Sequence, residues 1–477
     1  MIVPLTTALP CLAHHPALAP RAHMVGVAGA GMQALAQVLL ERGWRISGTD
    51  ANPPPAYWMR DWDVPLFVGH DDRQIAGDEQ LVIFSDAIPA DNVERRAASH
   101  RGLRQQSYAQ VVGALMTECR GMAVAGTHGK STTAAMIAQV MSGAGFDPTV
   151  IYGAAPLEGS NGGRAGDGEW MVAEACEYRA NFCHLRPEIA LVLGIEPDHF
   201  DYYATPLDLE AAFARFLGQV DRDGVIIANA DCPVTRRVLT DTSVRLVAFG
   251  FSPDADWRPG RIEHALGRHR FDIQFQGQNF GRVTLRVAGR HQVANALAAA
   301  AACHAAGVGH DEIVDGLNQF AGLRRRLEHV ATVAGIEVLD DYAHHPTEIH
   351  AALDATKLMY PGRRIWCIFQ PHQVSRTAAL LDEFAASLHN ADRVAVTDVF
   401  VARENPAVAP RVMAENLAER VRVLGGTALP DCNAETILNK IAAAVRAGDV
   451  VITLGAGDIR KRCDELVNRI RTYRASE

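Results

Sequence analysis

Short apolar segments alternate with helix-like segments near the start of the chain. Residues 23–28 form an apolar run of strand length, and residues 32–41 form a mostly apolar stretch of helical length. Two further strand-like runs cover residues 44–47 and 81–84. Strands and helices that alternate at this spacing predict a doubly wound α/β unit.

The same alternation continues through two later parts of the chain. The second part opens with a strand-like run at 121–125, a glycine turn and a helix at 131–141. It closes with a polar β-like stretch at 261–287 and an alanine-rich helix at 293–306. The third part begins with an apolar run at 336–339. Other strand-like runs in these two parts are residues 170–173, 189–193, 225–228, 365–369, 393–397 and 450–454.

The length of 477 residues exceeds what one hydrophobic core supports, so several domains are expected. The three α/β units predict domains at residues 1–117, 118–326 and 327–477. Residues 1–20 contain several prolines and lack a basic segment, so we expect a loose extension rather than a signal peptide.

The composition is that of an ordinary globular protein, with 48% hydrophobic and 21% charged residues. A formal net charge of -9 argues against a nucleic-acid partner, and no apolar run is long enough to span a membrane. The nine cysteines include no C-x-x-C pair, which disfavours a cysteine zinc site or a disulfide framework. Reduced thiols and a cytoplasmic location are expected.

A phosphate-binding loop is the strongest chemical signal. It lies between a predicted strand and a predicted helix, where glycines allow close backbone approach and N–H groups point at an anion. Lys130 would supply a charge for the β- and γ-phosphates, and Ser131 a hydroxyl ligand for magnesium. Val124 replaces the first Walker glycine, so the loop is a variant. The alternative is a structural glycine turn that binds no ligand and whose lysine is exposed to solvent. The loop residues are Gly126, Thr127, His128, Gly129, Lys130, Ser131 and Thr132.

A second glycine turn lies between the first predicted strand and helix. Gly29 and Gly31 open a G-x-G-x-x-A pattern, and Asp50 ends the following strand, where an acid that binds ribose would lie. The pattern fits NAD, FAD or another nucleotide diphosphate, and a purely structural tight turn is the alternative. Two phosphate loops on separate units predict either two nucleotides or one nucleotide and one nucleotide-linked substrate.

Acidic residues and a histidine follow two predicted strands of the second unit. Glu174 and Glu177 come after one strand, and Asp198 and His199 after the next. The carboxyl ends of strands are where α/β sheets bind ligands, so Glu174 and His199 could hold a second magnesium ion. Magnesium prefers oxygen ligands, and a loop or core histidine is an equally good interpretation of His199.

In combination, these motifs resemble the Mur ligase family over residues 22–460. The ordered matches include AGTHGKSTT, IEPDHFDYY, GRHQVANAL and LDDYAHHPTE, and their number makes the resemblance specific. The matching stretches are residues 23–32, 84–92, 125–133, 195–203, 289–297, 322–328, 339–348, 369–377 and 454–459.

The resemblance implies an α/β protein of three domains. These are an N-terminal Rossmann-like domain that binds a UDP-sugar, a central P-loop ATPase domain, and a C-terminal Rossmann-like domain that closes over the site. It further implies ATP and Mg²⁺ as cofactors, and UDP-N-acetylmuramate and L-alanine as substrates. The expected reaction forms an amide through an acyl phosphate in the synthesis of peptidoglycan precursors, without nucleic-acid or membrane partners.

The resemblance also assigns roles to individual residues. Lys130 serves the triphosphate, and Ser131, Glu174 and His199 serve the metal ions, with Lys130, Glu174 and His199 as the catalytic set. Asn295 is expected near adenine, while Arg326 and Asp341 reach the nucleotide from the hinge and the third domain. The residues expected at the UDP-sugar and the other substrate are Gly29, Gly31, Met32, Asp50, Ser85, His344, His372 and Arg376.

Four positions depart from the family pattern. Cys176 replaces an acid and is followed by Glu177-Tyr178-Arg179, while Gly194 and Gln292 each stand where asparagine is usual. Gln373-Val374 replaces an arginine and an aromatic residue. Because no nucleophilic partner is evident near Cys176 in the sequence, we expect this thiol not to be catalytic. Lys130 is expected to be exposed in its loop.

Three other functions compete with the L-alanine ligase. A related ligase attaches a recycled tripeptide to the same sugar nucleotide, and Glu177-Tyr178 favours it, whereas the short spacing from Phe182 to His199 does not. A dehydrogenase could use the first glycine turn but would leave the second phosphate loop without a role. A catalytically silent sensor could bind the UDP-sugar. The oligomeric state does not follow from the sequence.

Overall fold

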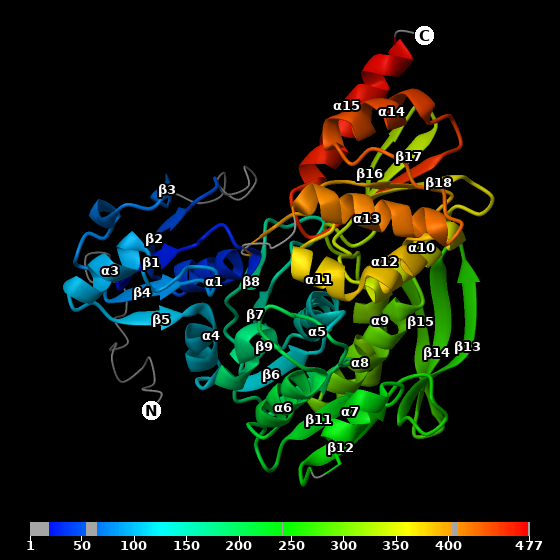
Figure 1. Ribbon diagram of the computed structural model, residues 1–477. Helices are drawn as coiled ribbons and strands as arrows, with labels where there is room; N and C mark the ends of the chain where they lie inside the picture. The colour runs from blue at the N-terminus through cyan, green and yellow to red at the C-terminus, as the bar shows by residue number, and fades with distance from the viewer. Residues whose placement is uncertain (1–18, 54–63, 241, 403, 405–408, 476–477) are drawn as a thin grey trace.

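The computed structural model describes residues 19–53, 64–240, 242–402, 404 and 409–475. Three β-sheets follow one another along the chain, each flanked by helices (Figure 1). The three-domain α/β architecture predicted from the sequence is confirmed. The predicted extension lies almost wholly outside the described residues. No helix in the described ranges is both long and apolar enough to cross a membrane.

The N-terminal domain contains a five-stranded parallel sheet in the order β3-β2-β1-β4-β5. Strand β1 is buried along most of its length because it lies at the centre of this sheet. Helix α1 packs its alanine- and leucine-rich face into the same core. The elements are β1 (Arg21–Val25), α1 (Ala30–Glu41), β2 (Arg45–Asp50), β3 (Leu66–Val68), η3 (Asp72–Gln74), β4 (Leu81–Phe84), α3 (Val93–His100), β5 (Gln105–Ser107) and α4 (Tyr108–Met116).

The central domain contains a ten-stranded sheet in the order β15-β14-β13-β12-β11-β10-β6-β9-β7-β8. Strand β6 lies between β10 and β9, so the chain leaves the sheet for α5 beside the ends of both neighbours. The elements are β6 (Arg120–Ala125), α5 (Lys130–Gly143), β7 (Thr149–Tyr152), β8 (Gly162–Arg164), β9 (Trp170–Glu174), η4 (Tyr178–His184), β10 (Ile189–Val192), α6 (Pro206–Leu217), β11 (Val225–Asn229), α7 (Pro233–Val238), β12 (Arg245–Phe249), β13 (Trp257–Ala265), β14 (Arg268–Phe275), β15 (Gln278–Ala288), α8 (His291–Ala305) and α9 (His310–Gln319).

The C-terminal domain contains a five-stranded sheet in the order β16-β17-β20-β18-β19, in which only β16 runs antiparallel to its neighbour. Helices cover both faces. The elements are β16 (Glu328–Val333), β17 (Ile336–Asp341), α10 (Pro346–Met359), β18 (Ile365–Phe369), α11 (Val374–Ala379), α12 (Leu381–Leu388), β19 (Arg393–Val396), α13 (Pro410–Val423), α14 (Ala434–Ala444), β20 (Val450–Leu454) and α15 (Ile459–Ala475).

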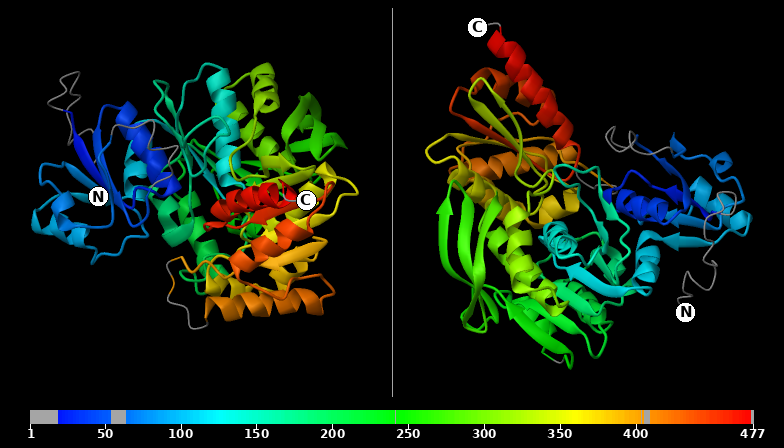
Figure 2. Two further views of the ribbon diagram at one scale, coloured as in Figure 1. Left: turned by 90° about the horizontal axis from the view of Figure 1, so that it is seen from above. Right: turned by 180° about the vertical axis from the view of Figure 1, so that it is seen from behind.

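The N-terminal domain forms a separate lobe beside the central domain in both views of Figure 2. Two helices bridge these domains: α1 packs against β7 and β8, and α4 packs against η4. Strand β8 and helix α1 approach each other closely. A Cβ on Gly163 would come within 2.0 Å of the Ala34 carbonyl oxygen, so only glycine fits at this position. The C-terminal domain covers the end of the central domain where the phosphate loop lies (Figure 1).

Candidate functional site

The phosphate loop has the backbone geometry expected of an anion-binding turn. Gly126 and Gly129 adopt φ values of 132° and 82°, which L side chains rarely adopt. Helix α5 then begins at Lys130 rather than at Ser131 as predicted, so its free N–H groups point into the loop. A Cβ on Gly129 would lie 2.6 Å from Oδ1 of Asn295, so any larger residue would have to displace this side chain.

Lys130 is not exposed, and the expectation that it would be is wrong. Its side chain is 12% exposed, and its ammonium donates to the carbonyl oxygens of Gly126 at 2.6 Å and Thr127 at 3.1 Å. Oε2 of Glu177 lies 2.9 Å from Nζ. Burial alone would lower the pKa of Lys130, but the Glu177 carboxylate outweighs it and raises this pKa. The loop therefore holds a fully charged lysine against its own carbonyl groups.

Glu177 connects the phosphate-loop lysine to the histidine that the sequence singled out. Oε1 of Glu177 lies 3.2 Å from Nε2 of His199, whose backbone adopts a left-handed φ of 57°. Burial alone would raise the pKa of Glu177, but Lys130 and His199 lower it to about 2. The Glu177 carboxylate therefore stays ionised and contacts both Lys130 and His199.

The expected metal-binding residues lie together. Oγ of Ser131 donates to Oε2 of Glu174 at 2.8 Å, and the Gly153 N–H donates to the same oxygen at 2.8 Å. His199 lines the same cavity as both residues. Hydroxyl and carboxylate oxygens are ligands that Mg²⁺ prefers, and the imidazole is the less usual one, so this set of donors fits the ion.

A cavity of about 560 Å³ opens above the loop and has walls from all three domains. Ala28, Ala30 and Gln33 line it from the N-terminal domain, and Tyr342 and His344 from the C-terminal domain. The central domain contributes Lys130, Ser131, Glu174, Cys176, Glu177, Asp198 and His199. Four arginines add positive charge, namely Arg324, Arg325, Arg326 and Arg460. Six acidic residues line the same cavity, so its wall presents charges of both signs.

A second cavity, of about 250 Å³, lies on the other side of the loop between the central and C-terminal domains. Asn295 lines it, as expected of a residue near adenine, and its Nδ2 donates to Oε1 of Gln292 at 3.0 Å. Asp341 accepts backbone N–H groups of Leu327 and Ala343, each at 2.7 Å. Burial raises the pKa of Asp341 to about 6. The loop residues His128, Gly129 and Thr132 and the hinge residue Arg326 complete the wall.

The N-terminal glycine turn reaches the larger cavity through its backbone. The positive φ belongs to Gly26, at 84°, whereas Gly29 has an ordinary φ of -64°. Asp50 organises the turn, because its carboxylate accepts the Ala28 N–H at 3.0 Å. Met32 is 3% exposed, so its side chain belongs to the domain core and only its backbone is available to a ligand.

Gly31 and Ser85 flank this turn, and neither side chain position lines the cavity. A Cβ on Gly31 would come within 3.1 Å of the Tyr108 ring, so glycine is needed here for close packing. Ser85 follows β4, and its hydroxyl accepts the Ala87 N–H at 3.3 Å. The turn is therefore a compact surface against which a nucleotide-linked substrate could lie, rather than a set of converging side chains.

Arg376 and His372 lie apart from the two cavities. Nε of Arg376 donates to Oδ1 of Asp198 at 2.7 Å, and both side chains are buried. The Arg376 guanidinium outweighs the effect of burial and holds the pKa of Asp198 well below its usual range. His372 stacks on Phe400, with ring centroids 5.5 Å apart. A substrate carboxylate would have to share Arg376 with Asp198 or replace it.

The remaining departures from the family pattern have local explanations. Burial raises the pKa of the Cys176 thiol to about 12, so this cysteine is a weak nucleophile, in line with the expectation that it is not catalytic. Gly194 adopts a φ of 155°, and its carbonyl oxygen accepts the Thr127 N–H at 2.9 Å. Gln373 is buried and has a φ of 72°.

Sequence reasoning missed several charged residues of the site. Glu196 and Glu348 contact His128, at 3.5 Å and 3.1 Å, and Thr347 donates to Glu196 at 2.6 Å. The sequence identified Glu177 as an acid after a predicted strand but not as the partner of Lys130. Each of these residues lies inside a motif that had already been identified, but no spacing rule shows which carboxylate of a motif faces which partner.

Family models match nearly all of the chain. The Mur ligase family, catalytic domain model matches residues 21–120, the Mur ligase middle domain model residues 124–303, and the Mur ligase, glutamate ligase domain model residues 325–457. The UDP-N-acetylmuramate--L-alanine ligase of Salinibacter ruber is 38% identical over 93% of this chain and 94% of that protein. The enzyme of the same name from Kineococcus radiotolerans is 39% identical over 94% of this chain and 96% of that protein.

Solved structures agree with the family models. The crystal structure of UDP-N-acetylmuramate-alanine ligase MurC from Thermotoga maritima superposes with a TM-score of 0.79 at 26% identity, over 96% of this chain and 100% of that one. A murein peptide ligase from Psychrobacter arcticus, at 24% identity and a TM-score of 0.73, shares the fold over 95% of this chain and 99% of that one. These findings confirm the family inferred from the sequence motifs: the chain belongs to the Mur ligase family.

Proposed function

We propose that this protein joins L-alanine to UDP-N-acetylmuramate at the expense of ATP. The observation that carries the proposal is the larger cavity, where Lys130, the Ser131–Glu174 pair and the N-terminal glycine turn face one space. The 38–39% identity to proteins named UDP-N-acetylmuramate--L-alanine ligase supports this choice of substrates. A cytoplasmic site of reaction, where ATP and reduced thiols are present, belongs to the same proposal.

The chemistry proceeds in two balanced steps. The lactyl carboxylate of the sugar attacks the γ-phosphorus of ATP, and ADP leaves, which gives an acyl phosphate. The free amine of L-alanine then attacks the acyl carbon, the tetrahedral intermediate expels inorganic phosphate, and the amine loses a proton. The first step is needed because a carboxylate would otherwise have to expel oxide, a very poor leaving group.

Each residue of the site has a role in this scheme. Lys130 neutralises charge on the phosphate oxygens as the phosphoryl group moves, and Glu177 holds it in place. Ser131, Glu174 and His199 would hold Mg²⁺, which supplies further positive charge to those oxygens when bound. Asn295 and Asp341 line the smaller cavity and would contact the adenosine. The C-terminal domain excludes water, which would otherwise hydrolyse the acyl phosphate.

Tyr342 and His344 are two of the C-terminal residues that line the larger cavity. Burial lowers the pKa of His344 to about 4, so its imidazole is neutral at pH 7. His372 and Arg376 are proposed to contact the carboxylate of the sugar acid or of L-alanine. For Arg376 this requires the ion pair with Asp198 to open or to be shared.

The test is phosphate release from ATP with UDP-N-acetylmuramate and a panel of amino acceptors. L-alanine should give the highest kcat/KM, with glycine and L-serine reduced by roughly 10- to 200-fold because one methyl or hydroxyl is worth about 1–3 kcal/mol. A higher kcat/KM for the tripeptide L-alanyl-γ-D-glutamyl-meso-diaminopimelate would assign the chain to the peptide-recycling branch instead. UDP-sugar binding without any phosphate release would identify a silent sensor.

A further inference from the structure

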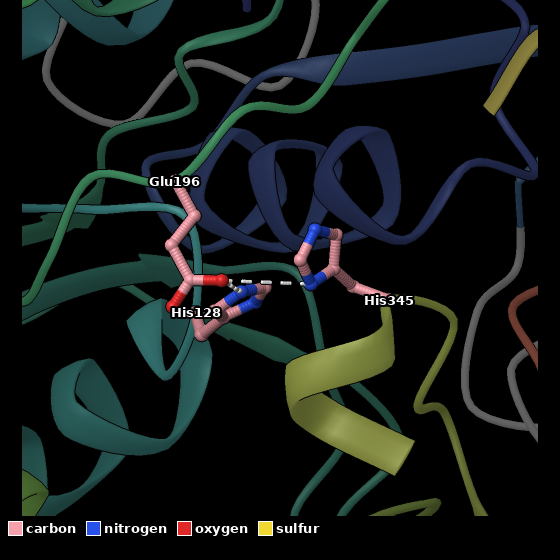
Figure 3. Close-up of side chains that lie close together, drawn as sticks. All are labelled: His128, Glu196 and His345. Carbon is pink, nitrogen blue, oxygen red and sulfur yellow. Dashed lines mark ion pairs between the residues drawn. The ribbon is translucent and has the colours of Figure 1, made fainter. Parts of the chain in front are cut away.

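Two histidines and a glutamate from three separate motifs meet beside the phosphate loop (Figure 3). His128 belongs to the loop itself, Glu196 follows β10, and His345 caps the N-terminus of α10 in the C-terminal domain. One potential ligand atom from each residue lies within 4.8 Å of the others. Their side chains point toward one common point from two domains.

The spacing of these atoms suits a shared ion better than direct hydrogen bonds. Oε2 of Glu196 lies 3.5 Å from Nε2 of His128 and 3.7 Å from Nδ1 of His345, and both distances are longer than a normal hydrogen bond. Ligand atoms about 2.0–2.1 Å from a tetrahedral zinc ion are separated by about 3.4 Å. The two measured distances are therefore close to the ligand–ligand separation in such a site before any ion binds.

Neighbouring side chains orient the three candidate ligands, as the residues around a metal site orient its ligands. Nδ1 of His128 lies 3.1 Å from Oε1 of Glu348, which directs its buried Nε2 toward Glu196. Among the described residues this Nε2 has no hydrogen-bond partner. Thr347 holds the Glu196 carboxylate through a hydroxyl donation of 2.6 Å. Histidine ligands of metals usually donate their second N–H to a carboxylate, as His128 does here.

His345 is the adjustable member of the set. Its Nδ1 accepts only a long bond of 3.3 Å from the Thr347 N–H, and its buried Nε2 has no hydrogen-bond partner in the described ranges. A metal ion at Nδ1 would replace that weak contact. The ring of His128 lies beside it, with centroids 4.7 Å apart, and a ring nitrogen of each lies within 4.8 Å of the other.

We propose that His128, Glu196 and His345 bind one transition-metal ion of the Zn²⁺ type, with a fourth position open to water. Two nitrogens and one carboxylate oxygen select such an ion over Mg²⁺, so this site is chemically distinct from the one at Ser131 and Glu174. Because its ligands come from the central and C-terminal domains, a bound ion would hold the C-terminal domain against the phosphate loop. The proposal concerns binding and does not depend on the ligase reaction.

Protons compete with the metal at this site. Burial alone would lower the pKa of His128, but Glu348 and Glu196 raise it to about 9. His344 also faces Glu348, at 3.3 Å, and shares that carboxylate. In the metal-free protein His128 therefore pairs with both carboxylates.

The test uses the full-length, chelator-treated protein in excess Mg²⁺, titrated with Co²⁺ and Zn²⁺. Wild type should bind one Co²⁺ with the intense visible absorption of a four-coordinate ion, and Zn²⁺ should displace it. His345→Gln should weaken this binding by about 100-fold or more, since outer-shell changes alone cost roughly 10- to 100-fold. His350→Gln, which alters an exposed histidine of the same helix, should bind as wild type does.

Glu196→Gln provides a second variant if His345→Gln does not fold by circular dichroism. Zn²⁺ should raise the unfolding temperature of wild type and of His350→Gln, and should leave both site variants unchanged. Equal binding by wild type and His345→Gln would overturn the proposal, because the ion would then occupy the magnesium site or a cysteine. The weak spectrum of six-coordinate Co²⁺ in wild type would overturn it as well.

Discussion

Charge pairing at single residues determines how the phosphate loop is held. Lys130 and His199 both contact the buried carboxylate of Glu177 and, against the effect of burial, lower its pKa to about 2. Removing one member of such a group leaves an uncompensated buried charge, which commonly costs about 3–5 kcal/mol. Substitutions in this group therefore affect stability as well as turnover, and a test of catalysis must separate the two effects.

Lys130→Met should lower phosphate release by at least about 100-fold, because one charge that stabilises the transferring phosphoryl group is lost. The same variant should lose a few kcal/mol of unfolding free energy, since Glu177 loses its closest cation. Lys130→Met combined with Glu177→Gln should recover the stability and not the turnover. Lys357→Met, an exposed change on α10, serves as the control. Near-normal phosphate release by Lys130→Met would contradict its assigned role.

Asp341 should make the stability of the nucleotide-free protein fall as the pH rises. Burial raises the pKa of Asp341 from 3.8 to about 6, so the folded chain binds more protons than the unfolded chain between these values. Asp341→Asn should therefore gain stability relative to wild type from pH 4 to pH 7, by up to about 3 kcal/mol. Chemical denaturation at several pH values measures the difference. A difference that does not change with pH, or the same change in exposed Asp354→Asn, would refute the assignment.

At the scale of elements, the strand–loop–helix joint from β6 to α5 positions the site. The loop places helix N–H groups beside the ends of β9 and β10, because β6 lies between these two strands. Glu174 ends β9, and the 195–199 segment follows β10, so the catalytic candidates come from the two strands that flank β6. Gly129 lets Asn295 of α8 approach the loop from the other side.

Gly129→Ala tests this connection between β6 and α5, with Gly145→Ala as a matched control. Gly129 and Gly145 have nearly the same φ, 82° and 80°, so alanine at either position should cost about 1–2 kcal/mol of stability. Only at Gly129 does the new Cβ collide with a side chain, Oδ1 of Asn295 at 2.6 Å, whereas nothing lies within 4 Å at Gly145. ATP binding, measured by calorimetry, should be lost in Gly129→Ala and retained in Gly145→Ala. Equal loss in both would mean that backbone strain alone is responsible.

At the scale of the whole molecule, ionic contacts join the C-terminal domain to the central domain. The Arg376–Asp198 pair is the most buried of these contacts among the described residues, and His128–Glu348 lies beside it. Both pairs lie next to the phosphate loop or the residues after β10. The side chains that hold the C-terminal domain against the central domain therefore adjoin the candidate site.

A double-mutant cycle on Arg376→Met and Asp198→Asn should reveal strong coupling. Each single change should cost about 3–5 kcal/mol, and the double change should cost clearly less than their sum, because it leaves no unpaired buried charge. Arg237→Met and Glu210→Gln, a pair with an arginine that is 58% exposed, should couple by less than about 1 kcal/mol. Additive costs at Arg376 and Asp198 would show that their pairing contributes no stability.

The sequence by itself determined the parts of this protein that are formed by contiguous residues. Strands at 81–84, 365–369 and 450–454 agree with the structure residue for residue, because short apolar runs next to turn residues have few other folds available. The polar stretch at 261–287 was correctly predicted as β structure, and the structure divides it into β13, β14 and β15. The phosphate loop was equally clear, since all of its residues are contiguous.

Only the tertiary structure decided which side chains meet. Lys130 and Glu177 are 47 residues apart, Asp198 and Arg376 are 178 apart, and His128 and Glu348 are 220 apart. Local patterns place each residue on an element, but the partner of a buried charge depends on how sheets and domains dock. For that reason the sequence predicted an exposed Lys130, whereas packing buries it against Glu177. Arg376, which was expected near a substrate carboxylate, is buried against Asp198.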